Sequence, residues 1–398
     1  MRASLPPRRP PATRLVKIRI GNCSDDGMNT LQIDNRSPYR NLIGVGGLGT
    51  GLFFALEGDH TLGRNESRPA RLLDVRDYCK LHIVIHYVAT LLGARRTGFP
   101  FHVLPVGKVG ADEAGRHVLD EMQNAGIDAS FVQIGKEKPT LLSVCFQYPD
   151  GSGGNMTTNN SAAAGLCERD LIEAAKFLKL NGPSTVALSV PEVPLSARKK
   201  FLELASEAGA FRAASFVEAE IATARQLGML EMLDLLALNA SEAEAFTGCP
   251  FSPDPSAEFA RRCQSLTEGP YRELRIIVTA GKEGAFAFFE GGYNFCRAPH
   301  VPAVSTAGAG DALLGGVLSA LVAGLPLIRS ESISKRLNDD PIATALELGV
   351  LLGSYKVTSP HTIHPSASLD ALLNFAGENG IQFSIDIRRG ECKHPIPS

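Results

Sequence analysis

The sequence predicts an α/β fold with a central, mostly parallel sheet that helices cover on both faces. From residue 168 onward, apolar runs of β type alternate with stretches of helical pattern. A continuous Ala/Leu-rich run at residues 312–321 follows a glycine-containing turn and has the pattern of a buried helix. Alternating strands and helices give a parallel sheet whose two faces are both covered.

Composition fits this class and excludes several others. The 398 residues are 44% hydrophobic and 21% charged, which allows one large domain with an appendage, or two domains. A net charge of −2 gives no general case for nucleic acid or an anionic membrane as partner. No apolar run reaches the ~20 residues of a transmembrane helix. The eight scattered cysteines form no C-x-x-C pair, so we expect reduced thiols and a cytoplasmic location.

The two ends differ from the rest of the chain. Residues 1–40 begin with an arginine- and proline-rich, acid-free stretch that lacks the apolar core of a secretory signal. Its proline pairs disfavour the amphipathic helix of a transit peptide. We therefore predict a disordered extension at 1–40, a domain at 41–375 and a C-terminal tail at 376–398.

The first part of the domain predicts strands at 41–45 and 52–56. Between them, residues 44–49 satisfy G-x-G-x-x-G, a dinucleotide fingerprint only if a helix begins at once. An aromatic stretch follows instead, which favours a strand over an NAD-binding turn. His82 and His86, on an apolar helix predicted at 80–93, have a spacing that can hold a metal. Without a third ligand, a polar stripe or partners of the nearby charged cluster fit them better.

The remaining elements follow in order. A strand at 101–106 precedes Asp112, which is placed to cap a helix through about residue 125. Two β-type runs at 130–148 lead into a hairpin-like turn at 151–155. Helices are expected at 168–180, 196–208, up to about 227, from 241, at 257–266 and at 346–353; strands at 185–189, 210–216, 233–238 and 275–279; and a short extended piece at 355–359.

The turn at Gly308-Ala309-Gly310 has the properties of an anion site. The first amides of a helix lack partners inside it and carry the positive end of its dipole. Asp311 would then lie where a carboxylate can take a proton from a hydroxyl that attacks a bound phosphate. Alternatively, Asp311 caps the helix and the glycines only pack it against the sheet. The local pattern leaves both interpretations open.

The segment from Thr306 to Asp311, followed by Gly315-Gly316, resembles the second signature of the ribokinase-like (PfkB-type) carbohydrate kinases. The resemblance extends over roughly residues 41–370. It implies a ribokinase-like fold with a small β lid formed by about 50–78 and 130–160. It also implies ATP-dependent phosphorylation of a hydroxyl on a sugar-like molecule.

The same resemblance assigns roles to individual residues. Asp311 is the expected base, and the amides of Gly308, Ala309 and Gly310 are expected to stabilise the transferring phosphoryl group. Ser305 stands where many members have an aspartate that ligates a monovalent cation, so potassium dependence stays open.

Other blocks resemble the parts of the family that bind Mg-ATP. Asn239 and Glu242 match an N-x-x-E motif that holds the magnesium-water network, with Glu242 acting on Mg²⁺ through water. Thr279 and Gly281 match a turn along the ATP phosphates, and Thr306 is expected to line the nucleotide. Simple helix capping is the alternative for the first pair, and an ordinary turn between strands for the second.

The substrate side departs from the family. Cys79-Lys80 stand where a Gly-Gly pair contacts sugar hydroxyls, and the usual aspartate of the first strand falls near Gly51. We therefore expect a substrate other than simple ribose or fructose. One hypothesis is an anionic substrate held by Arg64 and Arg68, together with Asn155. A solvated charged surface is the alternative for the arginines.

Two further expectations concern the whole protein. The lost substrate glycines make a non-catalytic sugar or nucleotide sensor the alternative function. Lid strands with open edges often pair between subunits, so a homodimer through the lid is expected. The sequence leaves the identity of the sugar open.

Overall fold

The computed structural model describes residues 18–22, 29–97, 99–150 and 153–387. Its centre is a ten-stranded sheet of order β16-β15-β14-β13-β12-β11-β10-β3-β6-β7. Neighbouring strands run parallel from β7 to β13, and β14 is antiparallel to both of its neighbours. This confirms the mostly parallel sheet. Its strands are β3 (Asn41–Val45), β6 (His102–Gly110), β7 (Val132–Gly135), β10 (Thr185–Ser189), β11 (Phe211–Ser215), β12 (Leu235–Leu238), β13 (Arg275–Thr279), β14 (Ala285–Phe289), β15 (Gly292–Arg297) and β16 (Ile333–Arg336).

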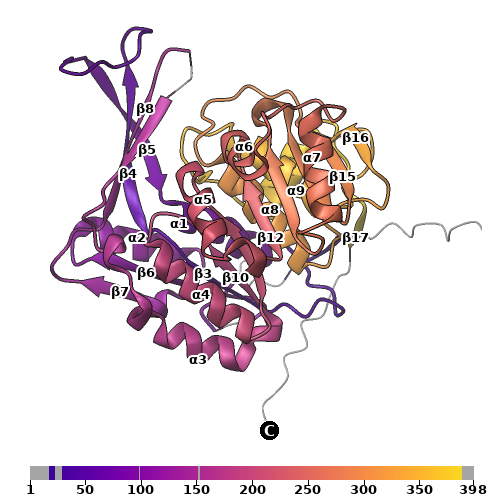
Figure 1. Cartoon of the computed structure of the whole chain (residues 1–398), viewed down its shortest axis with the longest axis horizontal. Helices are drawn as coiled ribbons and strands as arrows, with labels where there is room; N and C mark the ends of the chain where they lie inside the picture. Colours follow the sequence, from indigo (N-terminus) through magenta and orange to yellow (C-terminus); the bar gives the residue numbers. More distant parts are fainter. Residues whose placement is uncertain (1–17, 23–28, 98, 151–152, 388–398) are drawn as a thin grey trace, which may run out of the picture.

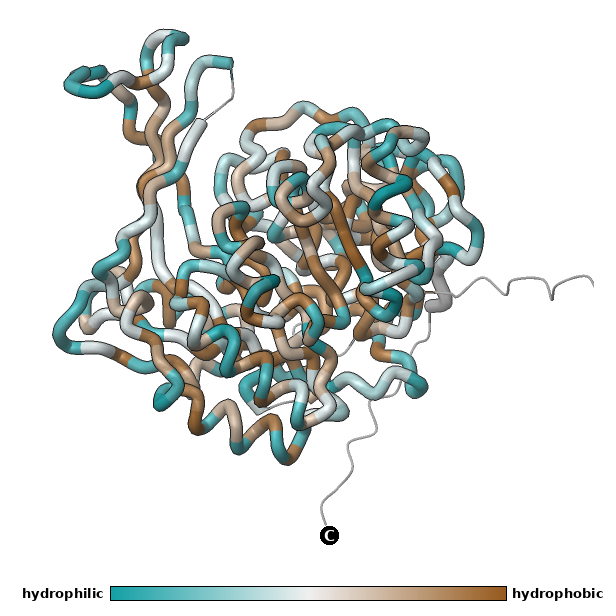
Figure 2. The backbone as a smooth tube through the Cα atoms, viewed as in Figure 1, coloured by the Kyte–Doolittle hydropathy of each residue, from teal (hydrophilic) through white to brown (hydrophobic). Residues whose placement is uncertain are grey.

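Helices cover both faces of this sheet, because successive residues of a strand point to opposite sides. Leu42 packs into a core that α1, α8, α9 and α10 close, whereas its neighbour Ile43 packs against α3 and α4. Helices α5, α6 and α7 cover the second face further along. Figure 2 shows the hydrophobic strands enclosed between these layers. The helices are α1 (Lys80–Leu92), α2 (Glu113–Asn124), α3 (Ile172–Asn181), α4 (Leu195–Glu207), α5 (Glu218–Gln226), α6 (Ala240–Thr247), α7 (Glu258–Glu268), α8 (Ala309–Val322), α9 (Ala345–Lys356) and α10 (Leu369–Glu378).

A second sheet forms the lid. Its four strands, in the order β5-β4-β8-β9, rise away from the body as an extended ribbon (Figure 1). They are β4 (Gly49–Leu56), β5 (Ala70–Tyr78), β8 (Leu141–Gln147) and β9 (Gly153–Thr157). Most of the expected lid is therefore present. Residues 132–135 are an exception, since they form β7 at the edge of the main sheet.

The two ends of the chain contradict the sequence prediction. Strand β1 (Ile18–Asn22) pairs with β2 (Asn29–Leu31) on one side and in parallel with β17 (Ile385–Ile387) on the other. The prediction of disorder at 1–40 is thus wrong for residues 18–22 and 29–40, and the tail predicted at 376–398 is wrong through residue 387. The reason is burial: Ile18, Leu31 and Ile381 are at most 3% exposed in the core beside α1 and α10. Residues 1–17 lie outside the described part.

Three local predictions also need correction or confirmation. The extended piece expected at 355–359 is wrong at its start, because α9 continues as a buried helix through Lys356. Of the turn expected at 151–155, Gly151 and Ser152 lie outside the described residues, and the rest belongs to β9. Strand β4 begins at Gly49, so residues 44–49 open no helix and form no dinucleotide fingerprint. In the described ranges, no helix has the length and apolar character needed to span a bilayer.

Candidate active site

Helix α8 begins at the glycine-rich turn. Its N-cap, Gly308, has a left-handed φ of 77°, and a Cβ there would lie 2.8 Å from the carbonyl oxygen of Thr362. Ala309 and Gly310 form the first turn. A Cβ added at Gly310 would meet no heavy atom of the described residues within 4 Å. The side of this turn on which Gly310 would carry a side chain is therefore open. Of the first amides, the N–H of Ala309 donates to the carbonyl oxygen of Thr306 at 3.1 Å.

The start of α8 lies between two cavities. The smaller, of about 370 Å³, is lined by Gly308 and Asp311, and the larger, of about 590 Å³, by Ala309 and Gly310. Thr306 lines both. A group bound at these amides would thus be in reach of molecules in either cavity. The structure brings together all four residues expected at the anion hole.

The smaller cavity lies beneath the lid and contains a buried aspartate that the sequence analysis missed. Asp77, at the end of β5, is 5% exposed and accepts a hydrogen bond of 2.9 Å from the hydroxyl of Ser143. Burial raises the pKa of this carboxyl. Gly51 is its partner across the strands, and a Cβ at Gly51 would lie 1.8 Å from Asp77 Oδ2. The carboxylate of Asp77 thus fills the space that a side chain at Gly51 would need.

A second carboxylate and an ammonium complete the polar wall. Glu192 adopts a positive φ of 76°, unusual for a non-glycine residue, and its Oε2 accepts from the backbone N–H of Lys80 at 3.0 Å. Burial raises the pKa of Glu192 to about 7. The ammonium of Lys80 lies 3.8 Å from Asp311 Oδ1, and the charge of Asp311 raises the pKa of Lys80. The residue that replaces a family glycine therefore contacts the expected base.

The three residues expected to contact substrate are in different places. Asn155, on β9, lines the smaller cavity. Arg64 and Arg68 belong to the loop between β4 and β5 and do not line it. The guanidinium of Arg68 is engaged by Glu66 Oε1 at 2.7 Å and by the carbonyl oxygen of His60 at 2.7 Å. The structure therefore does not bring the two arginines to the site.

The larger cavity is lined by three residues that the sequence analysis expected along a nucleotide, Thr279, Gly281 and Thr306. Val350 in α9 and Val357 directly after it also line this cavity. Gly281 has a φ of 57° in the short turn that joins β13 to the antiparallel β14. The turn between strands and the cavity wall, which the sequence offered as alternatives, are therefore both present.

Asn239 and Glu242 form a reciprocal capping box at the start of α6. Asn239 Oδ1 accepts from the N–H of Glu242 at 2.9 Å, and Glu242 Oε2 accepts from the N–H of Asn239 at 2.8 Å. The helix-capping alternative for Asn239 and Glu242 is thus confirmed by their hydrogen bonds. Burial raises the pKa of Glu242, and the charges of Lys80 and Asp311 also act on it. Glu242 consequently lies close enough to Lys80 and Asp311 for their charges to act on it while it caps the helix.

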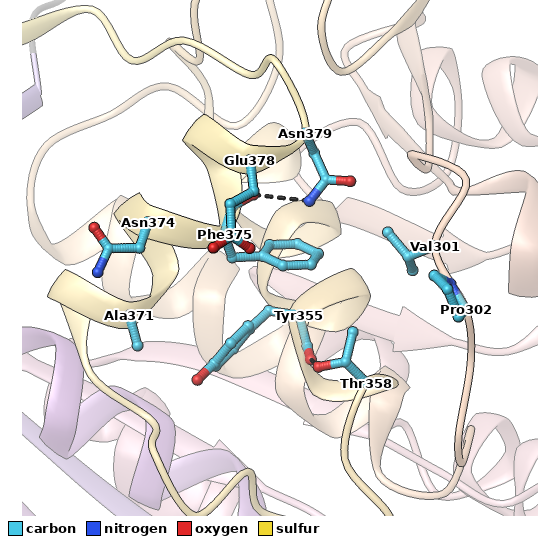
Figure 3. Close-up of a pocket in the computed structure, with 9 residues that line it drawn as sticks. All are labelled: Val301, Pro302, Tyr355, Thr358, Ala371, Asn374, Phe375, Glu378 and Asn379. Carbon is cyan, nitrogen blue, oxygen red and sulfur yellow. Dashed lines mark hydrogen bonds between the residues drawn. The ribbon is translucent and has the colours of Figure 1, made fainter.

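A further cavity of about 450 Å³ adjoins the larger cavity and shares Val301 with it (Figure 3). Tyr355 and Phe375 form its floor, with ring centroids 5.4 Å apart. None of the residues expected to take part in catalysis lines it.

His82 and His86 are not joined by a third potential metal ligand in the described part of the chain. Within the described ranges, no three His, Cys, Asp or Glu side chains are grouped as metal ligands. His82 is fully buried, with its ring 4.5 Å from that of Tyr78, so the expected polar stripe is wrong. Burial lowers the pKa of both imidazoles.

The fold belongs to the ribokinase-like class. A model of the pfkB family carbohydrate kinases matches residues 88–369. The chain belongs to this family and is a carbohydrate kinase, and the family uses ATP.

Individual relatives are distant. Fructokinase-2 of Solanum lycopersicum is 27% identical over 239 residues, covering 57% of this chain and 69% of its own. The 2-dehydro-3-deoxygluconokinase of Thermoproteus tenax is 25% identical over 286 residues, covering 68% and 79%. Among solved structures, a ribokinase from Cryptococcus neoformans var. grubii serotype A in complex with ADP has a TM-score of 0.65 at 20% identity, covering 84% and 99%. That structural likeness supports the fold alone.

The residues that sequence reasoning missed had a usable signal. Glu192 comes shortly after the end of β10, Asn239 comes directly after β12, and Thr279 is the last residue of β13; these strands are parallel. Ligands of such sheets bind at the carboxyl ends of the strands, so Glu192 was placed to take part. Asp77 carried no comparable signal, because its position depends on the pairing of β4 with β5.

Proposed function

We propose that the protein transfers the γ-phosphoryl group of ATP to a hydroxyl of a sugar or sugar-like molecule bound in the smaller cavity. One observation carries the proposal: the start of α8 lies between the two cavities. Asp311 faces the smaller cavity, Ala309 and Gly310 face the larger one, and Thr306 contributes to both. Donor and acceptor can therefore meet at a single set of amides.

In this proposal Asp311 is the general base. Its carboxylate takes the proton of the substrate hydroxyl, whose oxygen forms the new bond to the γ-phosphorus. The bond from that phosphorus to the bridging oxygen breaks, and ADP leaves with the electron pair. The amides of residues 308–310 stabilise the charge on the transferring group, so catalysis depends on positioning and electrostatics. Lys80, 3.8 Å from Asp311, orients the base.

The proposed hydroxyl contacts are Asp77, Glu192 and Asn155. Asp77 fills the space beside Gly51, so the neighbouring strand supplies the carboxylate that the family places on the first strand. Three carboxyl groups and one ammonium line the cavity beneath the lid: Asp77, Glu192, Asp311 and Lys80. This charge balance favours a neutral polyhydroxy substrate over a sugar acid or sugar phosphate.

The alternative substrate class is an anion held by Arg64 and Arg68. It makes an opposite prediction for KM. Asn155→Ala should raise KM for the substrate, whereas Arg64→Ala with Arg68→Ala should leave it unchanged. A rise in KM on loss of the two arginines would restore the anionic substrate.

Magnesium is the proposed metal. It prefers oxygen ligands and keeps several waters, which suits the buried Glu242 carboxylate near Asp311. When bound, Mg²⁺ neutralises charge on the phosphate oxygens. Glu242 would hold it through water, and Asn239 would keep that carboxylate in place through the capping box.

The test is ADP release from Mg-ATP against a panel of neutral sugars, sugar acids, sugar phosphates and nucleosides. Turnover with one of them supports the kinase. Tight ATP binding without turnover on any compound would support the non-catalytic sensor instead. Thermal shifts with Mg-ATP and with NAD provide a control on the nucleotide class.

The lid is also the proposed dimer contact. Leu52, Leu72 and Met156 are 41%, 57% and 61% exposed on its strands. A second copy of the lid would cover these side chains and the open strand edges. Light scattering after chromatography should give a dimer mass, and Leu52→Ser with Met156→Ser should give a monomer. A wild-type monomer at all concentrations contradicts this.

A further inference from the structure

Lys356 is a buried lysine that the proposed reaction has not used. It is the last residue of α9 and has no exposed surface. Its ammonium donates a hydrogen bond of 3.0 Å to the carbonyl oxygen of Ser305. Ser305 comes directly before Thr306 and Ala307, which lead into the proposed anion hole at Gly308. The ammonium thus lies directly behind this loop.

The charge of Lys356 is unusual in lacking an acidic partner. Three Lys and Arg residues of the described chain are buried, namely Arg198, Lys335 and Lys356. Arg198 pairs with Glu220 at 2.7 Å, and Lys335 with Glu347 at 2.9 Å. No ion pair joins Lys356 to a carboxylate of the described residues. An unpaired buried charge is costly, so its retention calls for an anion that arrives with a ligand.

The ammonium of Lys356 lies against a loop that is fixed to the end of α9. The backbone N–H groups of Val304 and Ser305 donate to the carbonyl oxygen of Val357 at 2.7 and 3.2 Å, which ties the loop to the end of α9. Asp77 and Asp311 act on Lys356 electrostatically. Burial lowers the pKa of Lys356 to about 8, so the ammonium is the major form at pH 7. Positive charge therefore lies beside the loop that leads into the first turn of α8.

We propose that Lys356 is a built-in cation of the anion hole. It is a positioning residue that fixes the Ser305 carbonyl and offsets the negative charge of the transferring phosphoryl group from behind the loop. The inference rests on the proposed function and deepens it. It also bears on the dependence on potassium, because the residues at 305 and 356 do not fit a monovalent cation. The ammonium of Lys356 already binds the carbonyl oxygen of Ser305, and the side chain of Ser305 is a hydroxyl where many family members have a carboxylate. The kinase should therefore need no potassium.

The first test uses the wild-type protein. Turnover on its best substrate is measured in potassium, sodium and choline chloride at equal ionic strength. We expect rates within twofold of one another. Activation by potassium of tenfold or more would overturn the proposal. Absence of turnover in every salt would instead refute the proposed function, so the two failures are distinguishable.

The second test uses variants. Lys356→Met should lower kcat by about 10²-fold while KM for ATP changes less than threefold, because removal of a preorganised charge acts mainly on the transition state. Lys356→Ala opens a cavity, so ammonium or potassium chloride should restore at least a tenth of the lost rate. Lys335→Met removes a buried cation elsewhere and should lower the Tm with little effect on kcat. A Lys356→Met enzyme with kcat within threefold of the wild type, or a Lys356→Ala enzyme that no small cation rescues, overturns the proposal.

Discussion

Gly310→Ala separates the anion hole from ordinary helix packing. A Cβ at Gly310 meets no described atom within 4 Å, so the folded protein accommodates the methyl group without strain. Alanine also favours the helix over glycine by up to about 1 kcal/mol. Stability should therefore be unchanged or rise, with a Tm increase of up to about 2 °C.

Activity should move the other way. The methyl group would occupy the space in which a phosphate contacts the first amides of α8. Loss of one such donor to the transferring group typically costs about 3–4 kcal/mol in the barrier, or about 10²–10³ in kcat. Coupled detection of ADP measures kcat, and calorimetry measures the Tm.

Two matched variants make the comparison sharp. Gly377 also lies in a helix, α10, with no described atom within 4 Å of its added Cβ, and it is far along the chain from the site. Gly377→Ala should raise the Tm similarly and leave kcat unchanged. Gly308→Ala should instead lower the Tm by several degrees, because the φ of 77° disfavours any side chain. If Gly310→Ala keeps kcat/KM within threefold of the wild type, the assignment of the anion hole is wrong.

Three more predictions follow from the site and its supports. Asp311→Asn should lower turnover by about 10²–10⁴-fold and leave ATP binding by calorimetry intact; retention of a tenth of the rate would exclude Asp311 as base. Burial holds the pKa of His86 at about 4, below its usual 6.5, so the unfolded state binds more protons between these values. The free energy of unfolding should fall by up to about 3 kcal/mol as the pH drops from 6.5 to 4. In thermal melts, His86→Gln should make the Tm depend less on pH over this range, and an unchanged pH dependence of the Tm would contradict the assignment to His86. Asp112 caps α2 through the N–H of Gly115 at 2.9 Å, so Asp112→Ala should cost about 1–2 kcal/mol in urea titrations without changing kcat, and Asp112→Asn should cost less.

The sequence predicted those parts of the fold that depend on local pattern. Strands β10 and β13 begin and end at the predicted residues, because short apolar runs are bounded there by turn residues. Asp112 was predicted as a cap for the same kind of local reason. The ends of the chain could not be predicted this way. Ile18 is held by pairing with β17 and by burial, and neither contact is visible in the arginine- and proline-rich composition around it.

In the candidate site, too, local sequence predicts the position of some residues, and tertiary contacts determine the position of the others. The position of Gly308 to Asp311 at the start of a helix was predictable, because it depends on one turn and one apolar run. Asp77 and Lys80 were not, since one acts through the neighbouring strand and the other through a contact with α8. Lys356 could not be predicted for a further reason. The sequence analysis placed it in an extended piece at 355–359, and only the packed structure shows it to be a buried residue at the end of α9.

The sheet that joins β1 to β17 has a consequence for biosynthesis. Chains emerge from the ribosome with the N-terminal end first, and domains tend to fold in that order. Ile18 can meet its partner Ile385 only after the long stretch of chain between them has been made. Until then β1 has an unpaired edge, which is a template for unwanted association with other chains. Synthesis of β17 therefore completes this sheet, and loss of β17 would leave one edge of β1 unpaired.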